Sequence, residues 1–285
     1  MDKTKILAMS LIIVIVLAGA AVLVVNNNND GVRKERDRDA VRMQMQSELS
    51  SVQHKVWAEL SSVSENLTAA SLALGATGLD GSAAKAVLNG LLANLSYEVD
   101  VVTINASGVI VAAMPAAYSD VEGTDISGQS QVLRMLLTRM PVMSDVFVMA
   151  EGFTAADIEV PVFTPDGLFI GSVSAALDLE SMMRVIVTSS VDTAKFQFTC
   201  LQTDGMEVYD TDEAQIGLNL FTDPAYHNYT AVLTFMHGLL GETDGYGTYE
   251  YYRTLGSKDL VQKEVYWSSV GLYGVEWRLL LIHAI

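Results

Sequence analysis

Histidine and cysteine side chains are the residues of this chain best suited to catalysis or metal binding. The histidines do not follow the HExxH spacing, and no GxSxG elbow, P-loop or dinucleotide fingerprint occurs. The four histidines are His54, His227, His237 and His283. The single cysteine, Cys200, lies in the alternating run KFQFTCLQ, which predicts a buried strand position. The sequence therefore predicts no enzyme, no metal site and no cofactor.

Acidic residues dominate the charge of the chain, which is −17 at neutral pH. This charge disfavours nucleic acid as a partner, because nothing offsets repulsion by the phosphates. Asp204, Asp210 and Asp212 cluster in DGMEVYDTDE, but they do not fit the loop of an EF-hand calcium site. We interpret these three as turn residues.

One segment, Ile6–Val25, is uncharged and almost wholly apolar, and its length matches a bilayer core of about 20 helical residues. Lys3 and Lys5 precede it, which favours a cytoplasmic tail at residues 1–5. A cleaved signal peptide is the alternative, but the apolar run continues past the AGA site at Ala18–Ala20. We therefore expect a transmembrane anchor at 6–25, a single pass through the cell membrane, and an extracellular location for the bulk of the chain.

A long helix is expected after the polar patch NNNNDG, and we assign residues 26–80 to it. Its apolar residues recur at spacings of three and four, which predicts one apolar stripe. The stripe contains Val41, Met45, Leu49, Val52, Val56, Leu60, Val63 and Leu67. It fits either a homodimer through a coiled coil or packing along the helix's own domain.

Two segments share one plan, namely VTINASGVIVAAMPAAYSDVEGTDIS and FTCLQTDGMEVYDTDEAQIGLNLF. Each has an alternating strand, a turn ending in glycine, a return strand and an acidic loop with a second glycine. Gly108 and Gly123 mark the first copy, and Gly205 and Gly217 mark the second. The repetition predicts two similar α+β modules in tandem.

Further elements fill in these modules. Helices are expected at 82–95 and from about Gln129, and strands at 144–149, 157–164 and 168–177, with Asp178 as a helix N-cap. The hairpin TPDGLFIGSVSAALDL closes the first module. In the second module Tyr249 and Tyr251 share a strand face, as part of a filled core or a ligand-stacking wall.

The order of a membrane helix, a long helix and two PAS-like modules resembles the double Cache (dCache) extracellular sensor family. EGTDISGQ, IEVPVFTPDGLFIGSVSAALDLESM and DGMEVYDTDEAQIGLNLF carry the resemblance, which covers roughly residues 32–285. It implies an α+β fold with a five- or six-stranded antiparallel sheet in each module and helices on one side. It also implies a membrane-distal module at 81–187, where small ligands usually bind, and a membrane-proximal module at 188–285.

The family comparison also suggests where a ligand binds. Amino-acid-binding members carry an arginine and an aromatic pair after GxDIS, where this chain has Gln129 and Gln131, and an aspartate at the position of Ala176. Because these charges are missing, we expect a small neutral or weakly charged ligand rather than an α-amino acid. The candidate ligand-binding residues by position are Gln129, Gln131, Ser144, Asp145 and Phe147.

We therefore predict a membrane-anchored extracellular sensor of an unidentified small molecule, without catalysis. No output domain follows the second module, so a separate signalling kinase or receptor is the expected partner. The alternative is a surface structural or protein-interaction scaffold with a degenerate pocket. An open cavity at the candidate residues favours the sensor, and a pocket plugged by Met114 or Met143 favours the scaffold.

Overall fold

The structure of the chain is a computed structural model that describes residues 3–148, 154–227 and 229–285. Side-chain positions are described from Val32 onward, except at Glu98, Val148 and Thr154. The chain divides into two compact units, Met1–Ser47 and Glu48–Ile285. The second unit contains both sheets and every pocket considered below.

Helix α1 (Lys3–Thr77) is continuous through the polar patch NNNNDG, so it extends the long helix expected at 26–80 toward the N-terminus. The run contains no proline, and asparagine and a single glycine weaken a helix without ending it. The expected membrane anchor, Ile6–Val25, falls within α1 but outside the residues whose side chains are described. Within the part of the chain that the structure describes, no helix is long and apolar enough to cross a membrane.

The apolar stripe of α1 packs along its own domain in the unit that begins at Glu48. Each stripe residue from Leu49 to Leu67 is buried within this single chain. Helix α1 also binds the second module through Gln53 Nε2, which donates to Ser269 O at 2.7 Å, and Lys55 Nζ, which donates to Ser190 Oγ at 2.8 Å. Of the two alternatives for the stripe, the intramolecular one is therefore the one that the structure shows.

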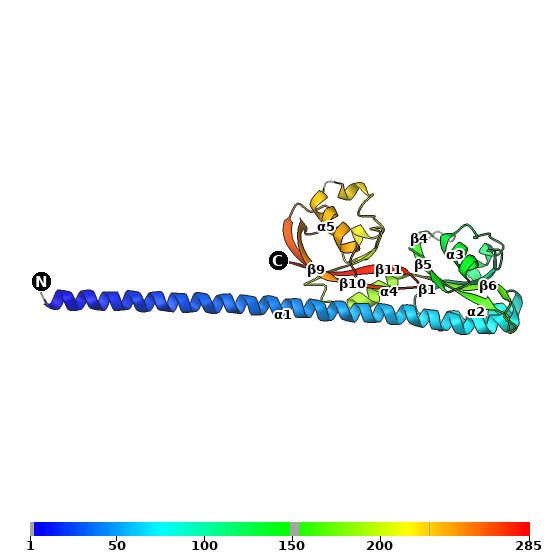
Figure 1. Ribbon diagram of the computed structural model, residues 1–285, viewed down its shortest axis with the longest axis horizontal. Helices are drawn as coiled ribbons and strands as arrows, with labels where there is room; N and C mark the ends of the chain where they lie inside the picture. The colour runs from blue at the N-terminus through cyan, green and yellow to red at the C-terminus, as the bar shows by residue number, and fades with distance from the viewer. Residues whose placement is uncertain (1–2, 149–153, 228) are drawn as a thin grey trace. The chain divides into compact units, whose positions relative to one another are not determined.

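The first module is built on a six-stranded antiparallel sheet in the order β2-β1-β6-β5-β3, with β4 paired to β5 (Figure 1). Its strands are β1 (Glu98–Asn105), β2 (Ile110–Met114), β3 (Val142–Met143), β4 (Phe147–Val148), β5 (Thr154–Phe163) and β6 (Phe169–Leu177). Its helices are α2 (Gly81–Leu92), η1 (Ala116–Val121), α3 (Ser130–Thr138) and α4 (Leu179–Thr188). The predicted helix at 82–95 and the hairpin closing the module are confirmed.

Helices cover both faces of the first sheet, so the expectation of helices on one side is wrong for this module (Figure 1). Val102 and Ile104 of β1 form a cluster with Val132 of α3. Thr103 points to the opposite face, because side chains alternate along a strand. Its hydroxyl donates to Leu79 O, in the link between α1 and α2, at 2.6 Å.

Two local predictions in this module have different outcomes. Asp178 caps α4 as predicted, because its Oδ1 accepts from Ser181 N at 3.0 Å. The predicted strand 144–149 is only partly correct: β3 ends at Met143, β4 begins at Phe147, and Met149 lies outside the described residues. Ser144 still bonds to β5, because Ser144 N donates to Asp157 O at 2.8 Å.

The second module has a five-stranded antiparallel sheet in the order β8-β7-β11-β10-β9. Its strands are β7 (Gln197–Gln202), β8 (Glu207–Asp210), β9 (Gly245–Tyr252), β10 (Leu260–Leu272) and β11 (Val275–Ala284). Short turns η2 (Glu213–Gln215) and η3 (Pro224–Tyr226) precede helix α5 (Thr230–Leu240), which the sequence did not predict. Val232 and Met236 of α5 pack in one core with Trp267 of β10 and Leu280 of β11.

The predicted internal repeat is confirmed by matching hydrogen bonds. Gly108 N donates to Asn105 O at 2.9 Å, and Gly205 N donates to Gln202 O at 3.0 Å. Both glycines have positive φ, 82° and 92°, which glycine adopts without a steric penalty. Each turn therefore requires its glycine, and the two modules share one hairpin design.

Candidate functional site

A narrow pocket, with a cavity volume of about 30 Å³ for water-sized molecules, lies between the first sheet and the segment leading into α3. Strand register explains its polar side. Asp100, Ala176 and Asp157 are directly opposed across β1, β6 and β5, and so point to the same face. The lining consists of Asp100, Val102, Ile104, Ile110, Ile126, Gln129, Gln131, Phe147, Asp157 and Ser174.

Three of the five candidate residues meet in this pocket. Gln129, Gln131 and Phe147 line it, and Gln131 Nε2 donates to Gln129 Oε1 at 2.8 Å. Ser144 is buried outside the lining, where its Oγ accepts from Asp157 N at 2.8 Å. Asp145 is exposed and does not line the pocket.

Neither methionine that was considered as a plug fills this pocket. Met143 is buried but does not line it, and Met114 is half-buried outside the lining. Neither proposed plug therefore occupies the pocket, which is narrow and is lined by three of the five candidate residues.

Buried carboxyl groups define the electrostatics of the pocket. Asp157 accepts from Ser174 Oγ, and Glu159, one row further along β5, accepts from Ser172 Oγ. Burial, and then the charge of Asp157, raises the pKa of Glu159 to about 8. Among the residues that the structure describes, the lining contains Asp100 and Asp157 but no lysine or arginine.

Asp100 and Asp157 were not among the residues expected to bind the ligand. The family comparison placed the ligand-binding aspartate at Ala176 on β6. The two carboxylates instead come from β1 and β5, the strands that flank β6. A signal was present in the sequence, since the acidic residues of DIEVP alternate with apolar ones along a strand. Strand pairing, which the sequence did not define, shows that they face the same cavity as Gln129.

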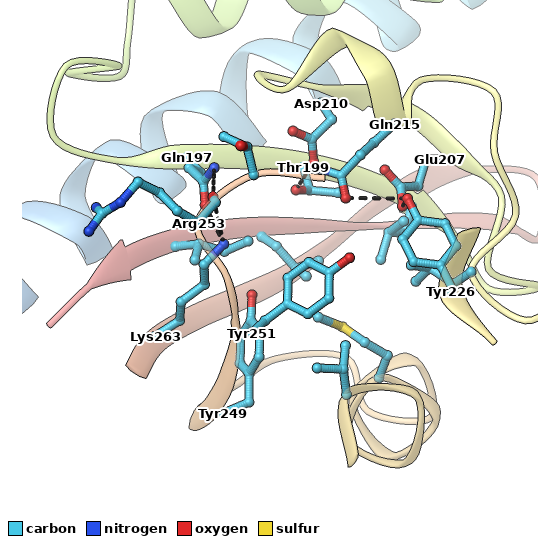
Figure 2. Close-up of a pocket in the computed structure, with 17 residues that line it drawn as sticks. Gln197, Thr199, Glu207, Asp210, Gln215, Tyr226, Tyr249, Tyr251, Arg253 and Lys263 are labelled. Atoms are coloured by element: carbon cyan, nitrogen blue, oxygen red, sulfur yellow. Dashed lines mark hydrogen bonds between the residues drawn. The ribbon is translucent and has the colours of Figure 1, made fainter. Parts of the chain in front are cut away.

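A second narrow pocket, with a cavity volume of about 40 Å³ for water-sized molecules, lies between the second sheet and α5 (Figure 2). Asp210, interpreted from the sequence as a turn residue, instead ends β8 and is buried in this pocket. Its carboxylate accepts from Thr199 Oγ1 and, at 2.6 Å, from Asp212 N. Tyr249 and Tyr251 belong to the core cluster, as the filled-core reading predicted, and they also line the pocket wall.

A family model for a sensor domain described as "HK/GC/Chemotaxis protein-like" matches residues 58–178. This range contains the end of α1 and the first module up to the start of α4. The pocket that contains Gln129, Gln131 and Phe147 lies within it. No curated protein matches the chain.

Solved structures of sensor domains share the fold. An extracellular ligand-binding receptor from Desulfohalobium retbaense is 33% identical, with a TM-score of 0.70; the match covers 83% of this chain and 39% of the receptor. The ligand-binding domain of the Pseudomonas fluorescens chemoreceptor CtaA, in complex with L-serine, is 16% identical over 88% of this chain and 98% of its own, with a TM-score of 0.62. The ligand-binding domain of the Pseudomonas aeruginosa amino-acid chemoreceptor PctC, in complex with GABA, is 16% identical, with a TM-score of 0.59; the match covers 82% of this chain and 94% of the PctC domain.

The family match and the shared two-module fold agree with the sequence motifs. Both modules, the long helix and the narrow pocket of the first module are present together. The predicted resemblance is therefore confirmed: residues 58–178 match a sensor-domain family, and the chain shares the fold of solved extracellular ligand-binding domains, consistent with the double Cache architecture.

Proposed function

We propose that the chain is the extracellular part of a membrane-anchored sensor whose first module binds a small organic cation. The observation that carries this proposal is that two buried carboxyl groups, Asp100 and Asp157, line the pocket together with Phe147. Buried carboxylates favour a positively charged ligand, because a counter-charge offsets the cost of removing them from water. Catalysis is not part of the proposal, since the sensor-domain family is typically non-catalytic.

The remaining lining suits an amine with a short organic body. The isoleucines of β1 and β2 supply apolar surface. Phe147 adds an aromatic ring, whose face attracts ammonium groups. Gln129 and Gln131 add amide oxygen atoms that accept from N–H donors. This proposal revises the sequence-based expectation of a neutral or weakly charged ligand.

Helix α1 is the proposed output of the sensor. It packs on both modules of its unit and continues toward the apolar run Ile6–Val25, which we propose as the membrane anchor. A ligand that binds more tightly when α1 is in one position increases the population of that position. The size of the shift is set by the difference in ligand affinity between the two positions. A kinase or receptor partner would receive this change.

Thermal unfolding of the full chain in mild detergent tests the ligand class. We expect choline and putrescine to raise the unfolding temperature in a saturable way, and L-serine, acetate and CaCl₂ to have no effect. A ligand at a hundredfold excess over its Kd stabilises the folded state by about 2.7 kcal/mol. Asp157→Asn and Asp100→Asn should each abolish the effect, because they remove the counter-charge and keep the shape.

Asp145→Asn is the matched control, because Asp145 is exposed beside the same module and does not line the pocket. It should respond as the original chain does. A stronger response to L-serine than to choline would contradict the cation preference. No response to any probe would support the scaffold instead.

A further inference from the structure

The pocket of the second module holds a lysine that is almost completely buried. Lys263 on β10 is 4% exposed, and its Nζ donates to Gln197 Oε1 at 2.7 Å and to Arg253 O at 3.2 Å (Figure 2). Both acceptors are neutral, and the ammonium group has three hydrogens. Among the residues that the structure describes, no acceptor is recorded for the third, so this cation lacks a directly bonded counter-charge.

Tyr251 supplies a second donor in the same pocket. Its hydroxyl oxygen is buried and has no hydrogen-bond partner among the described residues. The tyrosine ring lies beside the lysine, with Lys263 Nζ 5.5 Å from the ring centroid. A buried hydroxyl without a partner is unfavourable by about 1–3 kcal/mol, so a ligand atom that accepts from it would be stabilised.

Acidic residues share this pocket with the lysine, but none of them is hydrogen-bonded to it in the part of the chain that the structure describes. Asp210 is bonded to Thr199 Oγ1 and Asp212 N, and Glu207 lies at the other end of the pocket, against Tyr226 (Figure 2). Burial raises the pKa of Asp210 to about 7, so this carboxyl group is only partly ionised at neutral pH. Burial raises the pKa of Glu207 to about 9 and so keeps it uncharged at neutral pH. Burial lowers the pKa of Lys263, whereas the charges of Asp210 and Asp212 raise it; the resulting pKa of about 8 leaves Lys263 mostly charged at pH 7.

Apolar residues form the rest of the wall. Val232 and Met236 of α5 face Leu280 and Ile282 of β11 across the pocket. A hydrocarbon chain placed there is removed from water, which favours binding by about 0.8 kcal/mol for each CH₂ group. The two free donors and the apolar wall together match an acid with a short aliphatic tail.

We propose that the second module has its own ligand site, which binds a short aliphatic monocarboxylate. The carboxylate accepts from Lys263 Nζ and Tyr251 Oη, and the tail packs against α5. The two modules then prefer ligands of opposite charge: the first has carboxylates and, among the described residues, no basic side chain in its lining, and the second presents an ammonium group. The two sites respond to different compounds, and each can be tested without the other.

Isothermal titration calorimetry of the full chain with butyrate tests the site. We expect saturable binding of butyrate and none of its neutral isostere butyramide or of butylammonium. Lys263→Met should weaken butyrate binding by about ten- to hundredfold, as expected for the loss of a hydrogen bond from a charged donor. Tyr251→Phe, which keeps the ring and removes only the hydroxyl, should weaken it by about two- to tenfold.

Lys258→Met is the control, because Lys258 is exposed in the loop before β10 and does not line the pocket. It should bind butyrate as the original chain does. Affinity should fall as pH rises from about 7 to above 8, because Asp210 becomes ionised and Lys263 loses its proton over this range. This pH profile and Tyr251→Phe keep the test decisive if Lys263→Met does not fold.

Three results would overturn the proposal. The first is no saturable binding of butyrate, and the second is equal binding of butyramide. The third is unchanged affinity in both Lys263→Met and Tyr251→Phe.

Discussion

Replacing Glu207 by glutamine tests whether this buried carboxyl group carries a proton in the folded protein. Burial, followed by the charge of Asp210, raises its pKa from 4.5 to about 9. Geometry agrees, because Tyr226 Oη lies 2.8 Å from Glu207 Oε1 and 3.2 Å from Gln215 Oε1. The tyrosine hydroxyl has only one hydrogen to donate. Both contacts are hydrogen bonds when Tyr226 donates to Gln215 and a protonated Glu207 donates to Tyr226.

The expected magnitude follows from the linkage between proton binding and folding. Between pH 4.5 and about 9, Glu207 is protonated in the folded state and ionised in the unfolded state. The folded state therefore binds one more proton, and its stability falls as pH rises, by about 1.4 kcal/mol per pH unit. From pH 6 to pH 8 this single group destabilises the fold by about 3 kcal/mol. Glutamine does not ionise, so Glu207→Gln removes this part of the pH dependence.

Urea unfolding at pH 6, 7 and 8, followed by tryptophan fluorescence, measures the effect. The difference in unfolding free energy between Glu207→Gln and the original chain should change by about 3 kcal/mol over these two units, in favour of the variant at high pH. Glu250→Gln, at an exposed position on β9, is the control and should follow the original chain. Parallel pH profiles for Glu207→Gln and the original chain would show that Glu207 is ionised in the fold, which would refute the reasoning.

Two further predictions concern single positions and are measured by urea unfolding at one pH. Gly75→Ala in α1 should destabilise the protein by about 1–3 kcal/mol, because the added Cβ would lie 2.2 Å from Phe163 O. Gly90→Ala in α2 should instead stabilise the protein by up to about 1 kcal/mol, because no atom lies within 4 Å of the added Cβ and alanine favours the helix. Equal signs for the two substitutions would contradict the close approach of α1 to β5. Asp178→Ala should lower the unfolding free energy by about 1 kcal/mol through loss of the α4 N-cap. Asp120→Ala, at an exposed aspartate, is the control and should change the unfolding free energy little. Equal effects of the two substitutions would argue against the cap.

Local patterns in the sequence were sufficient for most elements of the fold. The stripe from Leu49 to Leu67, the Asp178 cap and the paired glycines Gly108 and Gly205 each depend on residues a few positions apart. Helix α5 was missed, although it has apolar residues throughout. TAVLTFMHGLL has Thr230, Thr234 and His237 on its exposed face, whereas Val232, Met236 and Leu239 are buried against the sheet.

The candidate site was predicted less completely than the fold. Gln129, Gln131 and Phe147 were found from their order along the chain, and they do line one pocket. Asp145 was included because it is close to them in sequence, yet it is exposed. Asp210 was assigned to a turn because aspartate is common there, yet it is buried at the end of β8.

The sequence by itself determined the two-module α+β architecture, the long helix and the sensor family, because these follow from periodicity, turn residues and short motifs. Only the tertiary structure decided the charge of the two pockets. Asp100 and Asp157 are 57 positions apart and meet because β6 pairs with both of their strands. Lys263 and Gln197, 66 positions apart, meet across the second sheet. The ionisation of such groups depends on burial and on neighbours brought together by strand pairing, which no local pattern in the sequence encodes.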